Sequence, residues 1–230
     1  MRRFIIMRTF TRAIAGTIAA GALAFGLAAC GGSSGGDGGS GGGGNSSSAS
    51  AKPVAEIDSL TGKSTSVKLD SGFTGALTSL GLTPGVVGTA QLTDGSLVFP
   101  ITGGNVTYYT PGTVKPYVQG SIEHEGSGFS LTAGSTKAEF TNFTIDPGTS
   151  QLFGDVSVNG KSAAKQAYLF NLDGSTLKPL QTNSDGTATL TGTIVEISPD
   201  AAPLLNSTFN TDAVKAGLVV GVATIVVNTK

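Results

Sequence analysis

The feature that most constrains the fold of this chain is a two-residue alternation of side chains in several short segments. In residues 117–124, Val118, Ile122 and His124 fall on one face of an extended strand, and polar or small residues fall on the other. A second extended run contains Phe140 and Phe143, although its alternation is imperfect. Because a period of two is typical of strands with one buried face, the sequence predicts a mainly β protein.

Turn signals separate the expected strands. Residues 152–158 and 167–172 flank Asn159-Gly160, a pair that readily adopts the positive φ angles of a tight hairpin turn. Further turns are expected at two Asp-Gly pairs, Asp173-Gly174 and Asp185-Gly186. Residues 187–197 have the pattern of a strand. Residues 218–227 are rich in apolar and β-branched residues but too few to span a bilayer, which predicts a buried central strand.

Two short helices are also expected. Phe73, Leu77 and Leu80 are spaced to share one helical face, after a cap at Asp70 or Ser71. A second helix should begin at residues 198–200, Ser-Pro-Asp, which supply a cap, a proline and an acid for the first turn. The predicted fold class is therefore all-β in the main: a single β-sandwich or barrel-like domain with one or two short helices, over residues 54–230.

The amino terminus predicts export and lipid attachment. An arginine-containing start precedes the apolar residues 13–29, as in a signal peptide. The four residues Leu27-Ala28-Ala29-Cys30 resemble the lipobox of bacterial lipoproteins. The resemblance implies that residues 1–29 are removed and that Cys30, the single cysteine of the chain, is acylated and anchors the protein to a membrane. The alternative is an ordinary signal peptide with an incidental cysteine. Both Met1 and Met7 fit as the start, and both secretory and twin-arginine export remain open.

Residues 30–53 hold a Gly/Ser-rich tether after the cysteine. Such a segment cannot bury enough apolar surface to fold, and about 22 flexible residues span roughly 25 Å. We therefore expect the β-rich head to be held on the extracytoplasmic side of the membrane, within the bacterial cell envelope. The net charge of −1 and the absence of a basic block argue against a nucleic-acid partner.

The head also resembles the HtaA-type domain of bacterial haem-uptake proteins. The likeness is an ordered series of motifs: Phe99-Pro-Ile-Thr-Gly-Gly104, the segment YVQGSIEHEGSGFSL at 117–131, residues 142–146 and 152–156, and then Leu190, residues 198–202 and Phe209. The resemblance implies a β-rich fold and haem as a ligand. In that family an early tyrosine binds the iron and a histidine assists it.

The family's ligand set does not carry over residue by residue. The early segment 67–76 resembles the family pattern V-K-x-S-F-x-x-Y, but Ala76 or a neighbour stands where the tyrosine is expected. His124 lies on the strand that matches the family's histidine strand, but at a shifted position. Four residues remain as candidate ligand-binding groups: Tyr108, Tyr109, Tyr117 and His124.

His124 is the single histidine of the chain, which limits its chemistry. A structural zinc site needs four Cys or His ligands, so no metal site is predicted. Glu123 and Glu125 should point away from His124 on a regular strand. Haem needs only one or two axial ligands and stays open. The simpler interpretation is that His124 ends a strand, before a turn at Gly126-Ser127-Gly128, and hydrogen-bonds at the rim of the core.

Catalytic patterns are weak. A Ser-His-Asp arrangement would need His124 with Ser127, which lacks the strand-to-helix elbow of a nucleophile. Paired carboxylates could come from Glu139, Asp146, Asp155 and Asp173, but these acids lie at expected strand ends and turns. The sequence thus predicts a non-enzymatic, lipid-anchored envelope protein whose head binds an envelope protein, a polymer or a small ligand, without a resident cofactor. The alternative is an HtaA-like haem-binding or haem-relay lipoprotein.

Overall fold

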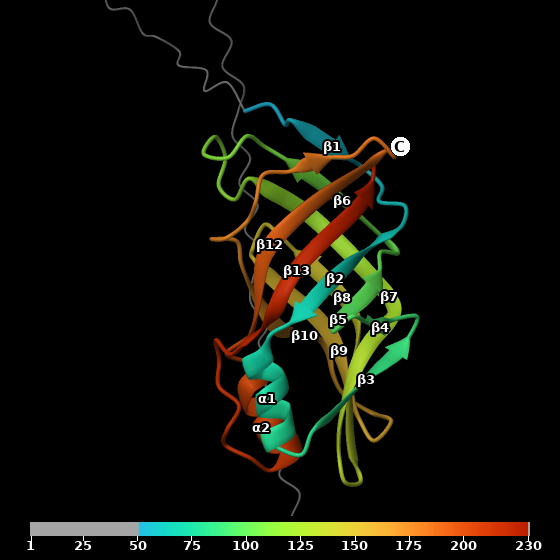
Figure 1. Ribbon diagram of the computed structural model, residues 1–230, viewed down its shortest axis with the longest axis vertical. Coiled ribbons are helices and arrows are strands. Elements are labelled where there is room, and N and C mark those ends of the chain that lie inside the picture. Colours follow the sequence, from blue (N-terminus) through green and yellow to red (C-terminus); the bar gives the residue numbers. More distant parts are fainter. Residues whose placement is uncertain (1–50, 230) are drawn as a thin grey trace, which may run out of the picture. The chain divides into compact units, whose positions relative to one another are not determined.

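The computed structural model describes residues 51–229, in which one curled antiparallel sheet carries two short helices at one end (Figure 1). The strands are β1 Ala55–Ile57, β2 Lys63–Leu69, β3 Thr83–Gly88, β4 Gln91–Thr93, β5 Ser96–Pro100, β6 Gly103–Tyr108, β7 Val118–Ala133, β8 Thr136–Asp146, β9 Gln151–Val158, β10 Lys161–Asp173, β11 Gln181–Thr182, β12 Thr187–Ile197 and β13 Val219–Asn228. The helices are α1 Ser71–Ser79 and α2 Ala201–Phe209. This confirms the predicted all-β class with short helices.

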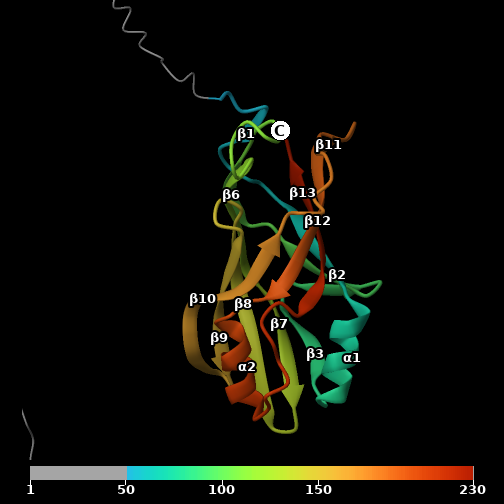
Figure 2. The same cartoon turned by 90° about the vertical axis from the view of Figure 1, so that its left-hand side faces the viewer.

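The sheet runs in the order β1-β6-β7-β8-β9-β10-β12-β13-β2-β5-β4, with β3 added to β7 and β11 to β12. Most neighbours in space are neighbours in sequence, as expected for strands joined by hairpins. Among the exceptions, β2 pairs with the last strand, β13, and so brings the two ends of the head together. The sheet curls so that the side chains of its inner face surround a common interior. Strands β1 and β11 lie at one end of the curled sheet, and the two helices lie at the other end (Figure 2).

Several sequence predictions are confirmed at residue level. The hairpin of β9 and β10 turns at Asn159 and Gly160, whose φ angles are 50° and 77°. Strand β12 has the predicted bounds, and β13 lies centrally between β12 and β2. Strands β1 to β6 and β11 were not predicted; each has seven residues or fewer.

Helix α1 is capped by Asp70, one of the two predicted caps, whose carboxylate accepts hydrogen bonds from the backbone N–H groups of Gly72 (2.7 Å) and Phe73 (3.3 Å). Phe73 and Leu77 are buried against the sheet. Helix α2 starts slightly later than expected, at Ala201, but Ser198 still accepts a hydrogen bond from its first N–H group (2.9 Å). Neither of these helices, the ones found in residues 51–229, is long and apolar enough to cross a membrane.

Strand β7 corrects the prediction that a turn follows His124. Residues 126–128 do not end the strand; they form a bulge, a register shift against β8 between His124 and Gly128, after which β7 continues to Ala133. Gly126 has a φ of 69°, a conformation that glycine adopts in bulges as well as in turns. The Gly-Ser-Gly sequence at 126–128 therefore gave the same signal as a turn. His124 therefore lies in the middle of a 16-residue strand.

The bulge of β7 is one of three that lie side by side on β7, β8 and β10. Asn142 on β8 and Gln166 on β10 also have positive φ angles, of 53° and 43°. The Asn142 side chain accepts from Gly126 N (3.0 Å) and donates to Asp155 on β9 (3.0 Å), and Asp155 accepts from Gln166 N (3.0 Å) and Lys165 Nζ (2.9 Å). This polar chain satisfies the backbone groups that the bulges leave unpaired, and it explains why Phe140 and Phe143 both face inward despite their odd spacing.

The core is one continuous cluster of apolar side chains that begins at Leu60 and ends at Val227. Its centre is aromatic: the rings of Phe129 and Phe140 stack at 4.9 Å, and Phe99 meets Phe143 edge to face at 5.3 Å. Residues 48–230 form their own compact unit, so the head carries its own core. The predicted signal peptide, Cys30 and most of the tether lie outside the described residues.

Candidate functional site

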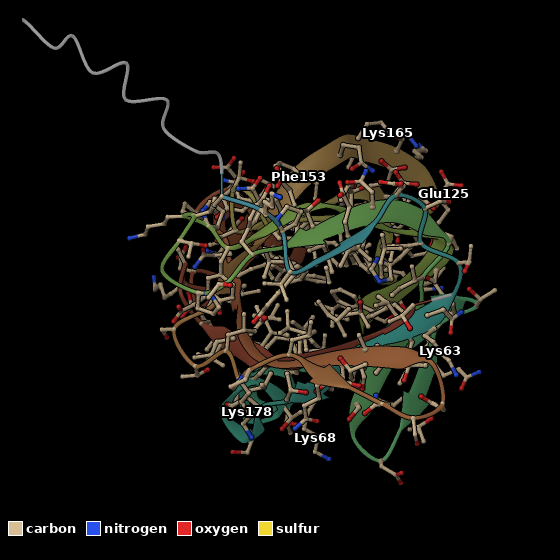
Figure 3. The ribbon with its side chains drawn as sticks, turned by 90° about the horizontal axis from the view of Figure 1, so that it is seen from above. Lys63, Lys68, Glu125, Phe153, Lys165 and Lys178 are labelled. Atoms are coloured by element: carbon tan, nitrogen blue, oxygen red, sulfur yellow. The ribbon has the colours of Figure 1, made fainter. Side chains whose placement is uncertain are left out.

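The end of the curled sheet opposite the helices encloses a cavity of about 430 Å³. Its walls come from ten strands, among them β1, β6, β12 and β13, together with the loops at 109–117 and 174–180. Most of the lining is Val, Leu, Ile and Ala; Ala188, Ala223, Ile225 and Val227 are typical. Figure 3 looks along the sheet from this end and shows inner side chains converging on the interior. A cavity of this size is within the range of small-molecule sites in proteins.

Charged side chains are kept outside this cavity. Its lining contains one ionisable residue other than tyrosine, Glu56 on β1, and no lysine or arginine. The labelled lysines Lys63, Lys68 and Lys165 point outward from the sheet (Figure 3). The cavity therefore suits a ligand that is mainly apolar, because a buried anionic group would find no opposite charge on these walls.

Tyr108 and Tyr117 form an aromatic pair in the wall near β1. Their rings meet edge to face at 5.8 Å and 87°, and Tyr108 is 8% exposed. Burial, and to a lesser degree Tyr108, raises the pKa of Tyr117 above its ordinary value, so this phenol is neutral at pH 7. Both side chains line the cavity, and each carries a hydroxyl that can hydrogen-bond a ligand or coordinate an iron ion.

His124 lies deep in the interior, not at the rim of the core as the sequence had indicated. The side chain is 1% exposed, its Nε2 lies 2.9 Å from Thr65 Oγ1, and its ring meets Phe99 edge to face at 6.4 Å. Burial lowers the pKa of His124 to about 4, and a backbone contact with Phe143 opposes this shift in part. By geometric criteria, Nδ1 has no hydrogen-bond partner in the described part of the chain. The imidazole is therefore neutral at pH 7.

The four candidate residues do not converge on one point. Tyr108 and Tyr117 share the large cavity, whereas His124 lines a separate space of about 50 Å³ toward the helices. Tyr109 lines neither; its backbone N–H donates to the carbonyl of Tyr117 (2.7 Å) and so fixes the loop that holds the tyrosine pair. The two cavities share five lining residues, which join them into one interior.

The alternatives for chemistry find no support in the described residues. Ser127 is fully buried and its hydroxyl donates to the carbonyl of His124 (3.2 Å), so it does not face the imidazole nitrogens as a nucleophile would. Asp155 is occupied by the bulge network, and Asp173 accepts from its own turn. Within residues 51–229, no three His, Cys, Asp or Glu residues are grouped so as to hold a metal ion.

Comparison with solved structures finds the same fold elsewhere. The C-terminal domain of HtaA from Corynebacterium glutamicum is similar over 74% of this chain and 98% of that domain, with a TM-score of 0.52 and 15% sequence identity. The haem-binding protein HtaB of the same organism is similar over 76% of this chain and 96% of its own, with a TM-score of 0.45 and 10% identity. No family model and no curated protein matches this chain. The likeness to HtaA confirms the fold that the motif order implied.

The resemblance put Ala76 or a neighbour where the family has its early tyrosine. Ala76 lies on α1 and lines a space of only about 30 Å³, closed by Phe73, Leu77 and side chains of α2. His124 does not line that space. The early tyrosine that the resemblance implied is therefore not found at this position, and of the four candidate residues Tyr108 and Tyr117 line the large cavity.

Sequence reasoning missed Thr65, the hydrogen-bond partner of His124. Thr65 is 3% exposed and faces inward from β2, next to Val67. The alternation of residues 63–69 was a usable signal, because it places Thr65 and Val67 on the same face of a strand. What the sequence could not show is the pairing of β2 with β13 at the far end of the chain, which carries Thr65 into the interior.

Proposed function

We propose that the head is a non-enzymatic binding module that holds a mainly apolar small ligand in the large cavity, and that haem is the first ligand to test. The observation that carries the proposal is the cavity itself, about 430 Å³ of apolar space with two tyrosine hydroxyls in its wall. A concave, mostly apolar space of this size with a few polar groups in its wall is typical of small-molecule sites, which favours a ligand-binding role over an accident of packing.

Haem is supported by the fold and only partly by the side chains. The walls suit the apolar face of a porphyrin, and a tyrosine oxygen is a known iron ligand in proteins. No basic side chain lines the cavity to pair with the propionates, so these would have to remain at the open end. An apolar ligand without iron fits the same walls, and the experiment must separate the two.

We also propose that the head is held at the bacterial envelope by acylation of Cys30. The support is the lipobox-like Leu27-Ala28-Ala29-Cys30 and the Gly/Ser segment that follows it. Two or more acyl chains would give stable anchoring, whereas one would not. The test is to measure the mass of Cys30-containing peptides from the protein in its native host, where we expect the added mass of acyl chains. An unmodified Cys30 would refute the proposed lipid anchor.

The ligand is tested by titrating the head, residues 48–230, with haemin and, separately, with the neutral fluorescent probe N-phenyl-1-naphthylamine. Haem binding predicts a saturable absorbance change near one-to-one stoichiometry, altered in Tyr108→Phe or Tyr117→Phe. Tyr168→Phe is the matched control, because Tyr168 packs on Phe153 and does not line the cavity. Saturable binding of the fluorescent probe alone would keep the binding module and remove haem. No saturable binding of either would overturn the proposed function.

A further inference from the structure

The two interior spaces meet at five residues, and one of them is polar. Thr65, Val67, Ile145, Leu152 and Val195 line both the large cavity and the smaller space beside His124. Four of the five are aliphatic, so the hydroxyl of Thr65 is the single side-chain polar group at this junction. A ligand that fills the large cavity from the tyrosine end would meet Thr65 with its leading end.

Thr65 is positioned by His124 and retains hydrogen-bonding capacity. A threonine hydroxyl can donate one hydrogen bond and accept two, and the bond to His124 Nε2 (2.9 Å) uses one of these three. No other hydrogen bond involves the Thr65 side chain within residues 51–229. Whichever imidazole tautomer is present, the hydroxyl therefore has a donor or an acceptor left for a partner on the cavity side.

The space beyond Thr65 has room for a small polar group. It measures about 50 Å³, more than a water molecule needs, and the His124 ring is part of its lining. This space and the spare hydrogen-bonding capacity of Thr65 are together what a polar subsite needs.

We propose that Thr65, held in place by His124, is a polar subsite at the inner end of the cavity, and that the ligand is an apolar molecule whose leading end carries one uncharged hydrogen-bonding group, such as an alcohol. This inference rests on the proposed function and names the class of iron-free apolar ligand for the same cavity. Both subsite residues are almost fully buried, so they act on the part of the ligand that is desolvated.

The leading group is uncharged because this end of the cavity has no countercharge. The imidazole is neutral at pH 7, and neither interior space is lined by lysine or arginine. A carboxylate placed beside Thr65 would lose its hydration without gaining an ion pair, which costs far more than one hydrogen bond returns. A molecule with both a charged and an uncharged end would therefore keep its charge at the open end.

The test measures displacement of N-phenyl-1-naphthylamine from the head by three ten-carbon competitors: 1-decanol, 1-chlorodecane and decanoate. Thr65→Val removes the hydroxyl with little change in shape, and Thr65→Ser restores it. We expect Thr65→Val to weaken 1-decanol about fivefold to tenfold, the effect of one buried hydrogen bond. The same variant should change 1-chlorodecane and decanoate less than twofold, and Thr65→Ser should retain most of the wild-type affinity for 1-decanol.

Each result decides between the two proposals. If Thr65→Val leaves 1-decanol unchanged, or weakens all three competitors equally, the polar subsite is wrong while probe binding upholds the cavity. If the wild-type head does not bind the probe, the proposed function itself fails. Thermal unfolding of each variant shows that it is folded; should Thr65→Val not fold, Thr65→Ala removes the same hydroxyl and is read in the same way.

Discussion

Filling the large cavity should stabilise the head and block its ligand, which is unusual for an enlarged core residue. Ala223 lies on β13, is buried, and lines the cavity between Val67 and Thr193. Ala223→Leu adds three carbon atoms that can point into the unfilled space. At about 0.8 kcal/mol for each buried methylene group, the gain is at most about 2.4 kcal/mol. Loss of leucine rotamer freedom reduces it to about 1–2 kcal/mol.

The matched control is Ala138→Leu on β8. Ala138 is equally buried, at 1% exposure, but lines none of the interior spaces described above. The same three carbons there must displace packed neighbours, which typically costs about 1–3 kcal/mol. Urea unfolding of the two variants and the wild-type head should therefore give free-energy changes of opposite sign, and probe binding should be lost only in Ala223→Leu.

One result would refute this reasoning. If Ala223→Leu destabilises the head as much as Ala138→Leu does, the space next to Ala223 is not available to a side chain and the cavity cannot hold a ligand there. A stabilised variant that still binds the probe with wild-type affinity would instead place the ligand elsewhere on the head.

Three further variants test the fold that shapes the site. The hydrogen bond to Lys165 is the main reason why the pKa of Asp155 is lowered to about 2. Its contribution to the free energy of unfolding, about 1 kcal/mol, is therefore present above pH 4 and is lost as the pH falls toward 2. Asp155→Asn should remove this pH dependence of stability, measured by urea unfolding at stepped pH. Gly104→Ala should cost about 2 kcal/mol or more in thermal unfolding, because its φ is 110° and a Cβ would lie 2.0 Å from Ser121 O. Gly75→Ala should gain about 0.5–1 kcal/mol by circular dichroism melting, because nothing lies within 4 Å of a Cβ at that helical position.

Local chemistry in the sequence predicts the local structure well. The Asn159-Gly160 turn and the Asp70 cap depend on residues a few positions apart, and both occur as expected. The bounds of β12 follow from its flanking turn and the cap of α2. These features need no knowledge of the rest of the chain, because the hydrogen bonds that define them are made within four or five residues.

The sequence could not predict the features that depend on contacts between distant segments. The sequence around Gly126 predicts a turn, but the structure has a bulge there. The reason is a hydrogen bond from Gly126 N to the side chain of Asn142 on the next strand, which the sequence does not reveal. His124 read as the end of a strand for the same reason. The cavity is a still longer-range property, since it exists because β2 pairs with β13 and closes the interior around Thr65.

The Thr65–His124 pair itself gives the strongest test of whether the interior is shaped for stability or for binding. Removing one partner leaves the other buried and unpaired, so Thr65→Val and His124→Phe should each cost about 1–3 kcal/mol. Replacing both with apolar side chains of similar shape removes every unpaired polar atom, including Nδ1 of His124. The double variant should then be as stable as the wild-type head or about 1 kcal/mol more stable. Denaturant unfolding of the wild-type head, the two single variants and the double variant gives the coupling energy between Thr65 and His124 directly. A double variant that loses the sum of the two single effects would show no coupling between Thr65 and His124 and would contradict this reasoning. A stable double variant that no longer distinguishes 1-decanol from 1-chlorodecane would show that the polar pair is maintained, against the stability of the fold, for its ligand.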